Sequence, residues 1–175
     1  MISQLTFETA RLSVENWDRI LSNPAKRNKL ESELKVLLTP IIMYRLPLSM
    51  KFSVNEDSIT KWVDDRINEV QILCVHARDT AELVGLVLLF DNPEETRIPT
   101  VQLGYILGEP NWGKGYATEM IKALISAMKS GPRMRLAAGV DRDNVASAGV
   151  LEKCGFEKLH EQSTGSQNFF ELVIA

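Results

Sequence analysis

The stretch that decides the fold reads Asn111-Trp112-Gly113-Lys114-Gly115-Tyr116-Ala117-Thr118. A segment typical of a strand, Thr100–Leu107, precedes it, and the clearest amphipathic helix of the chain follows it. Apolar residues recur at helical spacing from Ala117 to Met128, and Ser130-Gly131-Pro132 supplies the glycine and the proline that end the helix. The sequence therefore predicts a strand, a glycine-containing turn and a helix in direct succession.

This turn has the chemistry of an anion cradle. The first turn of a helix leaves N–H groups without partners and presents positive potential, and glycines without Cβ atoms let a phosphate approach the backbone closely. From Gly113 and Gly115 alone, a tight turn that needs glycine only for its dihedral angles is an equally good interpretation. The P-loop and the dinucleotide fingerprint both fail on residue identity, since the latter needs Gly or Ala where Thr118 stands. A diphosphate cradle of another kind fits better.

The segments around this unit predict an α+β (mixed α/β) fold in which helices cover a sheet. Asn23-Pro24 supplies a cap and a first-turn proline for a helix that lasts until Pro40, and a second helix follows Asn55. Ile41–Lys51 has no clear pattern. The other predicted strands lie near Arg11–Glu15, at Gln71–Ala77, Glu82–Phe90 and Met134–Val140, and at about Glu157–Gln162 and Gln167–Val173.

Length, composition and charge exclude several classes of protein. The 175 residues predict one domain, 1–175, and 45% hydrophobic with 25% charged residues is typical of a folded protein. A net charge of −3 without a basic block argues against nucleic acid as a partner. The longest apolar run, Leu83–Phe90, is too short to cross a bilayer, so we expect no membrane partner and a cytoplasmic location. Cys74 and Cys154 fit neither a disulfide framework nor a metal site, and we expect both to be reduced and buried.

Two motifs in the right order carry a resemblance to a known family. The first is Leu103-Gly104-Tyr105-Ile106-Leu107 followed by Trp112–Glu119, and the second is Asn144–Phe156. Together they resemble the acetyl-CoA-binding segments of the GNAT N-acetyltransferase superfamily, in its ribosomal-protein-serine/alanine N-acetyltransferase-like (RimJ/RimL-type) branch. The opening Phe7–Leu12 is similar to the start of that branch. The family form Gln/Arg-x-x-Gly-x-Gly/Ala is matched at Gly115 and Ala117, whereas Trp112 replaces its first residue.

The resemblance implies a fold and a set of ligand-binding residues. The fold is a central twisted mixed sheet of about six to seven strands flanked by helices. Backbone amides from Gly113 to Thr118 would bind the CoA diphosphate, and the strand ending at Leu107 would pair with the pantetheine arm. The cofactor-binding residues implied in this way are Tyr105, Ile106, Leu107, Trp112, Gly113, Lys114, Gly115, Tyr116, Ala117, Thr118 and Asn144.

Acetyl transfer to an amine needs an oxyanion donor, a proton for the departing thiolate and a neutral amine. The backbone N–H of Leu107 is the expected oxyanion donor. Many relatives protonate the thiolate with a tyrosine, but Leu151 stands there, which leaves Ser147 as the catalytic candidate. A serine bonded to a backbone carbonyl one turn back is the competing interpretation. Gln102 stands where relatives often carry a glutamate, so the general base is unassigned.

These observations predict an acetyl-CoA-dependent N-acetyltransferase with acetyl-CoA as cosubstrate. Its acceptor would be a primary amine of a protein N-terminus, an amino acid or a small polyamine, and Ile41–Lys51 would line the acceptor cleft. The alternative is a non-catalytic acyl-CoA-binding regulatory module, which Leu151 and Gln102 favour. A homodimer is left open.

Overall fold

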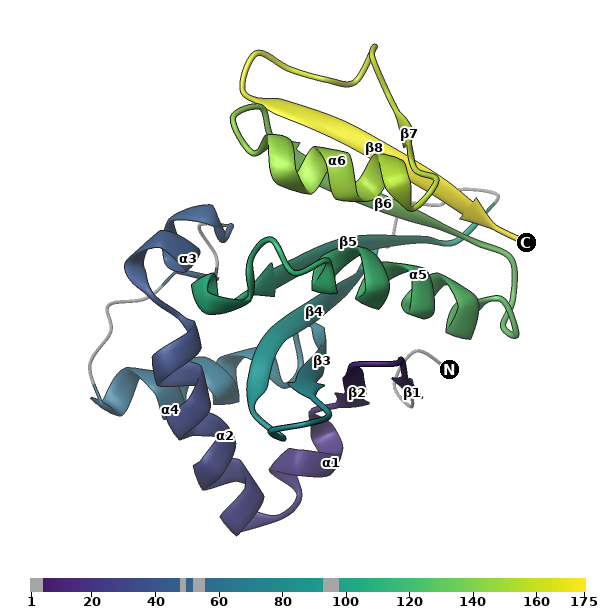
Figure 1. Cartoon of the computed structure of the whole chain (residues 1–175). Helices are drawn as coiled ribbons and strands as arrows, with labels where there is room; N and C mark the ends of the chain where they lie inside the picture. Colours follow the sequence, from purple (N-terminus) through teal and green to yellow (C-terminus); the bar gives the residue numbers. More distant parts are fainter. Residues whose placement is uncertain (1–4, 48–49, 52–55, 93–97) are drawn as a thin grey trace.

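The computed structural model describes residues 5–47, 50–51, 56–92 and 98–175 of the chain. Figure 1 shows a twisted sheet with helices on both sides, and the eight strands lie in the order β1-β2-β3-β4-β5-β6-β8-β7. The strands are β1 (Thr6–Glu8), β2 (Leu12–Asn16), β3 (Gln71–Ala77), β4 (Leu83–Asn92), β5 (Thr100–Leu107), β6 (Met134–Asp141), β7 (Glu157–Lys158) and β8 (Gln167–Ile174). The helices are α1 (Asp18–Leu21), α2 (Pro24–Leu37), α3 (Pro40–Arg45), α4 (Glu56–Arg66), the 3₁₀ turn η3 (Glu109–Asn111), α5 (Tyr116–Met128) and α6 (Val145–Lys153).

The mixed character of the sheet comes from one pair of strands. β5 and β6 run parallel, whereas every other pair of neighbours in the sheet is antiparallel. A parallel pair needs a crossover, and α5 supplies it between β5 and β6. The predicted α+β fold is confirmed, and the sheet exceeds the expected six to seven strands because the three-residue β1, which the sequence did not indicate, also pairs. β7 ends earlier than predicted because the chain turns back after Leu159, whose carbonyl accepts a hydrogen bond from Ser163 N–H at 3.1 Å.

Helix starts follow the capping signals in the sequence. The side chain of Asn23 accepts a hydrogen bond from Lys26 N–H, and α2 begins at Pro24, as predicted. Thr39 and Pro40 repeat this pattern at the start of α3, whose other residues lie inside the segment that gave no assignment. Six residues are too few for apolar periodicity to indicate a helix, so α3 could have been predicted only from its cap.

The sheet is buried on both faces. Alternate residues of β3 point to opposite sides, so Leu73 and Val75 pack with α5 and α6, whereas Ile72 and Cys74 pack with α2, α3 and α4. Among the helices in the described part of the chain, none is long and apolar enough to cross a membrane.

The two cysteines lie in different surroundings. Cys74 is fully buried, and this burial raises the pKa of its thiol far above the ordinary value. Cys154 is only half-buried at the end of α6, where its thiol lies 3.8 Å from the carbonyl oxygen of Thr118. The prediction of a free thiol is confirmed for both, whereas full burial is wrong for Cys154, because a helix terminus leaves one side of its side chain uncovered.

Candidate active site

The site begins where β5 and β6 separate. Their parallel pairing ends at Gln102 and Ala137, and Figure 1 shows β6 and β8 diverging from β5 beyond this point. Gly108 N–H donates to Val84 C=O on β4 at 2.9 Å, so by alternation the odd-numbered residues of β5 turn their backbone groups toward β6. The backbone N–H groups of Tyr105 and Leu107 therefore face the gap rather than a neighbouring strand.

The turn after β5 exposes a continuous row of backbone N–H groups. Gly113 and Gly115 have φ angles of +73° and +80°, in the left-handed region that favours glycine. Gly115 is the N-cap of α5, and no side chain caps this helix. Across the described residues, the N–H groups of residues 113–118 have no hydrogen-bond acceptor. Six consecutive free donors at a helix N-terminus make an anion-binding cradle.

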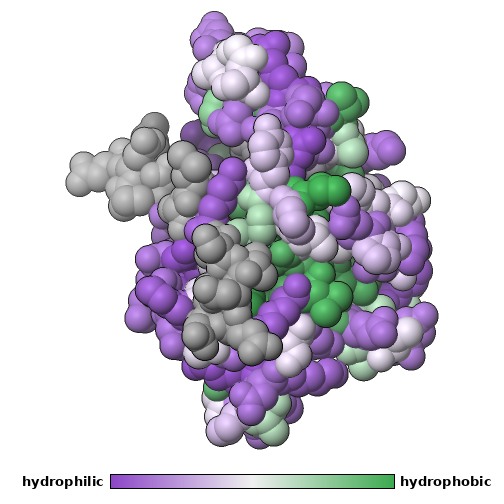
Figure 2. Space-filling model, turned by 90° about the vertical axis from the view of Figure 1, so that its left-hand side faces the viewer, coloured by the Kyte–Doolittle hydropathy of each residue, from purple (hydrophilic) through white to green (hydrophobic). Residues whose placement is uncertain are grey.

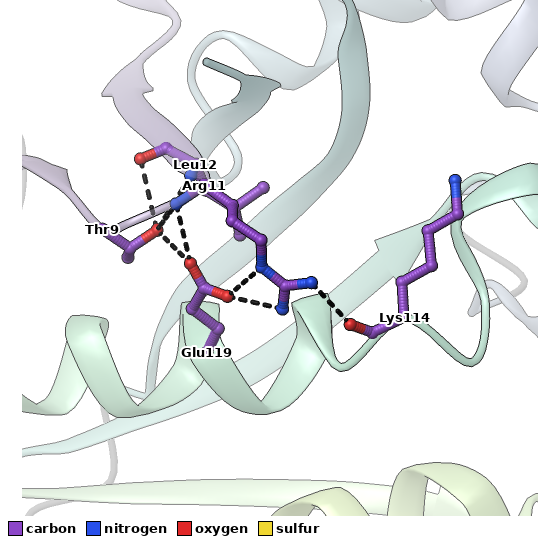
Figure 3. Close-up of polar contacts among 5 residues, drawn as sticks. All are labelled: Thr9, Arg11, Leu12, Lys114 and Glu119. Atoms are coloured by element: carbon purple, nitrogen blue, oxygen red, sulfur yellow. Dashed lines mark hydrogen bonds and ion pairs between the residues drawn. The ribbon is translucent and has the colours of Figure 1, made fainter. Parts of the chain in front are cut away.

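Two residues from the start of the chain hold this cradle in place (Figure 3). Glu119, in the first turn of α5, accepts hydrogen bonds from Thr9 Oγ1 at 2.6 Å and Arg11 N–H at 3.0 Å, and its Oε2 lies 2.6 Å from Arg11 Nη2. Arg11 Nη1 also donates to the carbonyl of Lys114 at 2.9 Å, and its guanidinium lies 4.5 Å from the centre of the Tyr116 ring. Burial by itself raises the pKa of Glu119, but the hydrogen bonds from Thr9 and Arg11 and the Arg11 charge lower it overall. The sequence did not indicate this contact, because more than a hundred residues separate its partners.

The cradle opens into a cavity of about 570 Å³, here called the cradle cavity. It runs between the end of β5, the turn and one face of α6 from Ala146 to Lys153, with Ile41, Ile42 and Arg45 of α3 at one side. Eleven of the twelve residues predicted for the site line it: Tyr105, Ile106, Leu107, Trp112, Gly113, Gly115, Tyr116, Ala117, Thr118, Asn144 and Ser147. Lys114 does not line it, and its Nζ lies 3.3 Å from Oδ1 of Asn111, which does.

Trp112 closes one side of the cradle cavity. Its indole Nε1–H donates to the carbonyl of Leu107 at 2.7 Å, while 51% of the residue stays exposed. This bond satisfies the C=O of Leu107 and leaves its N–H directed at the gap between the strands. Trp112 therefore fixes the end of β5 relative to the cradle.

A second cavity of about 770 Å³, the sheet cavity, meets the first. Its walls are mostly apolar, from Leu88, Phe90, Leu103, Val140 and Phe169, with Tyr44–Pro47 and Lys51 at one side. Figure 2 looks at the side of the molecule where α3 and the open end of the gap lie, and shows apolar surface gathered in the middle with hydrophilic surface around it. The two cavities share Arg45, Tyr105, Ile106, Asn144 and Ser147. Part of the unassigned Ile41–Lys51 segment thus lines the sheet cavity.

Two residues with hydroxyl groups, Ser147 and Tyr105, line both cavities where these join. Asn144 caps α6 by accepting from Ser147 N–H at 3.3 Å, which fixes the first turn that carries Ser147. Within the described ranges, the Ser147 hydroxyl has no hydrogen-bond partner, so the alternative of a bond to a carbonyl one turn back is not formed. The Tyr105 hydroxyl donates to the backbone carbonyl of Ser147 at 3.3 Å. Burial raises the pKa of Tyr105 to about 12, against the hydrogen bond to Ser147, which lowers it.

No histidine or acidic base was assigned from the sequence, and the two histidines lie elsewhere. His76, near the C-terminal end of β3, lines a separate cavity together with Glu15 and Glu33, and its burial lowers its pKa. His160 is exposed in the turn after β7. Gln102 lines the sheet cavity, and Leu151 is fully buried beside it. The described lining of the sheet cavity carries one carboxylate, Asp141, which already accepts from Gln167 Nε2 at 3.2 Å.

Comparison with known proteins supports a common origin for this geometry. The sequence model of the acetyltransferase (GNAT) domain matches residues 19–157, which is 139 of the 175 residues. The "Uncharacterized N-acetyltransferase YoaA" of Bacillus subtilis is 33% identical over 85 residues, 48% of this chain, and the match spans about half of that relative, 47%.

Solved structures share the fold at low sequence identity. An acetyltransferase (GNAT family) from Bacillus anthracis superposes with a TM-score of 0.74 at 18% identity, covering 97% of this chain and 98% of that one. Spermidine N-acetyltransferase from Vibrio cholerae, solved with CoA and spermine, gives a TM-score of 0.69 at 15% identity over 95% and 97% of the two chains. The family model matches most of the sequence, and the solved structures share the fold. The chain therefore belongs to the GNAT acetyltransferase family.

Proposed function

We propose that the protein is an acetyl-CoA-dependent N-acetyltransferase that passes the acetyl group directly to a primary amine. The observation that carries this proposal is the row of free N–H groups at residues 113–118, which opens into a cavity that meets a second one. CoA carries a diphosphate that these amides would bind. Its pantetheine arm would lie in the gap between β5 and β6, bonded to the free backbone groups of Tyr105 and Leu107.

Direct transfer follows from the way the cavities meet. Acetyl-CoA in the cradle cavity would present its thioester near Tyr105 and Ser147, and an amine in the sheet cavity would attack it from the other side. The N–H of Leu107 would stabilise the oxyanion, and the Ser147 hydroxyl would donate a hydrogen bond to the sulfur. Asp141, the one carboxylate in the described lining of the sheet cavity, already accepts a hydrogen bond from Gln167. An ordered water would therefore deprotonate the amine.

The acceptor is proposed only as a class, a primary amine of a protein N-terminus, an amino acid or a small polyamine. The similar structures include a spermidine acetyltransferase and a ribosomal L7/L12 protein acetyltransferase, so related folds accept both kinds of amine. We further propose that the acetyltransferase domain spans residues 1–175, since the sheet runs from Thr6 to Ile174. Free Cys74 and Cys154 suit the reducing cytoplasm. A homodimer would be tested by light scattering.

The first experiment is calorimetry with acetyl-CoA. We expect binding in the micromolar range for the wild type and none at hundreds of micromolar for Gly113→Asp, because a carboxylate in the open space beside Gly113 repels the diphosphate. Gly155→Asp is the matched control, since Gly155 also has a positive φ, +91°, and is exposed away from the walls of both cavities. Equal loss in both variants, or no binding by the wild type, would contradict the proposal.

The second experiment separates the enzyme from a non-catalytic acyl-CoA-binding module. The fully buried Leu151, which offers no proton beside the junction, is the observation that favours a module. Thiol release from acetyl-CoA would be followed with a panel of amino acids, N-terminal peptides and polyamines. Release above the enzyme-free rate with any amine establishes the enzyme, whereas tight binding without such release across the panel establishes the module.

A further inference from the structure

Tyr105, predicted from the sequence as a cofactor-binding residue, also lies where the two cavities join. It is one of five residues that line both cavities, and it projects from β5 toward α6, where it packs with the core that includes Leu151. Its hydroxyl lies 3.3 Å from the backbone carbonyl oxygen of Ser147. A phenol is therefore held at the point where a bound thioester would meet an incoming amine.

The chemistry at this point requires an acid. When the tetrahedral intermediate collapses, the C–S bond breaks and its electron pair stays on sulfur, which must then be protonated for efficient release. Among the five residues shared by the cavities, only Tyr105 and Ser147 carry an O–H group. A phenol, with an ordinary pKa near 10, is a much stronger acid than the hydroxyl of serine.

We infer that Tyr105 is the catalytic proton donor to the departing CoA thiolate, in the reaction proposed above, and that Ser147 only hydrogen-bonds the sulfur. In the step, the Tyr105 O–H bond breaks and the S–H bond forms as the thiolate leaves. The phenolate then takes a proton, through water, from the nitrogen that attacked as a neutral amine. The balance is R–NH₂ plus acetyl-CoA giving R–NH–acetyl plus CoA–SH, with no external acid consumed.

Two further observations bear on this role. Burial raises the pKa of Tyr105 to about 12, which keeps the phenol protonated at neutral pH but also makes it a weaker acid, so the transfer needs the developing thiolate to lie within hydrogen-bond distance of the hydroxyl. Its present acceptor is a main-chain carbonyl at 3.3 Å, a long O–H···O distance that a nearby thiolate would outcompete.

The first test compares Tyr105→Phe with Ser147→Ala in steady-state thiol release, with the most active amine of the panel as the acceptor and the enzyme-free rate subtracted. Tyr105→Phe is expected to lower kcat at least 50-fold with the Kd for acetyl-CoA within threefold of the wild type, and Ser147→Ala to lower kcat less. A kcat within threefold of the wild type for Tyr105→Phe, or a larger loss in Ser147→Ala, would overturn the inference. A wild type that binds acetyl-CoA but releases no thiol would overturn the enzyme proposal as well, so the two failures are distinguishable.

The second test excludes a merely structural role for the phenol. Site-specific 3,5-difluorotyrosine at position 105 keeps the shape and the hydrogen bond but makes the phenol more acidic. If Tyr105 must be protonated to donate, the basic limb of the kcat profile moves to lower pH. An unchanged pH profile, with kcat retained, would assign Tyr105 to positioning α6 instead.

Discussion

Gly113 and Gly115 show how single residues set the chemistry of the cradle. Both have positive φ, but a Cβ added at Gly115 would lie 3.5 Å from Arg11 Nη2, whereas one at Gly113 would meet nothing within 4 Å. The space beside Gly113 is the space that a bound phosphate would use. A side chain there should therefore affect ligand binding more than folding.

Gly113→Ala separates these two effects. The left-handed backbone costs a non-glycine residue about 1–2 kcal/mol, so we expect a loss of that size in the free energy of unfolding. The affinity for acetyl-CoA should fall at least tenfold, because the methyl group enters the cradle. Urea denaturation and calorimetry on the same variant would measure both, and an unchanged affinity would contradict the placement of the diphosphate.

Glu119, which connects the first turn of α5 to Thr9 and Arg11, is a residue whose ionisation can be tested. Its pKa is lowered from the ordinary 4.5, so its charged form contributes stability above that pH, and the contribution is lost as the pH falls through the lower folded pKa. Glu119→Gln should therefore be less stable than the wild type at pH 7, and the difference should shrink on acidification below about 4.5. Denaturation midpoints between pH 7 and pH 3 would check this. A difference that stays constant with pH would show that the charge is unimportant.

At the scale of elements, two helix caps in this chain make the same bond but differ in their position relative to the site. Asn23 and Asn144 make the same bond, in which the side-chain oxygen accepts from the N–H three residues on, at 3.1 and 3.3 Å. Asn23 caps α2 away from both cavities adjoining the cradle, whereas Asn144 caps α6 where these cavities meet. The two caps form a matched pair for separating stability from activity.

Asn23→Ala and Asn144→Ala should each cost about 1 kcal/mol of stability, the usual value of such a cap. Only Asn144→Ala should also lower kcat, by roughly tenfold, because the turn that carries Ser147 loses its anchor. Thermal unfolding and steady-state kinetics would be measured for both. A comparable loss of kcat in Asn23→Ala would attribute the effect to stability alone.

At the scale of the whole molecule, one arginine connects the two sides of the divided sheet. Arg45, at the end of α3, lies 2.6 Å from Asp143, which follows the diverging strand β6, and 3.6 Å from Asp141, the last residue of that strand. All three side chains are at least one-third exposed, and surface pairs of this kind contribute only about 0–1 kcal/mol to stability. The contact therefore matters more for the shape of the cavities than for folding.

Arg45→Ala should leave the free energy of unfolding nearly unchanged but raise the KM for the amine several-fold, because α3 would no longer be tied across the sheet cavity. Arg27→Ala is the control, since Arg27 makes comparable pairs with Glu31 and Asp64 away from the shared cavity walls. The KM should rise for Arg45→Ala only, and the effect should be imitated in the wild type by high salt. Equal KM values for both variants would reject this role.

The sequence by itself determined the local backbone. Spacing and caps predicted β3 and β5 at their observed bounds, the start of α2 at Pro24 and the turn that leads into α5, because these depend on contacts within a few residues. The same local motifs carried the resemblance to the acetyltransferase family. They also predicted eleven of the residues that line the cradle cavity.

Only the tertiary structure decided which distant residues meet. The bonds of Glu119 with Arg11, of Tyr105 with Ser147 and of Arg45 with Asp143 join residues 108, 42 and 98 positions apart. They depend on where β5 and β6 stop pairing and on how α3 and α6 pack beside the gap. Since local periodicity specifies which face of an element is buried but not the element it packs against, these contacts could not be predicted from spacing.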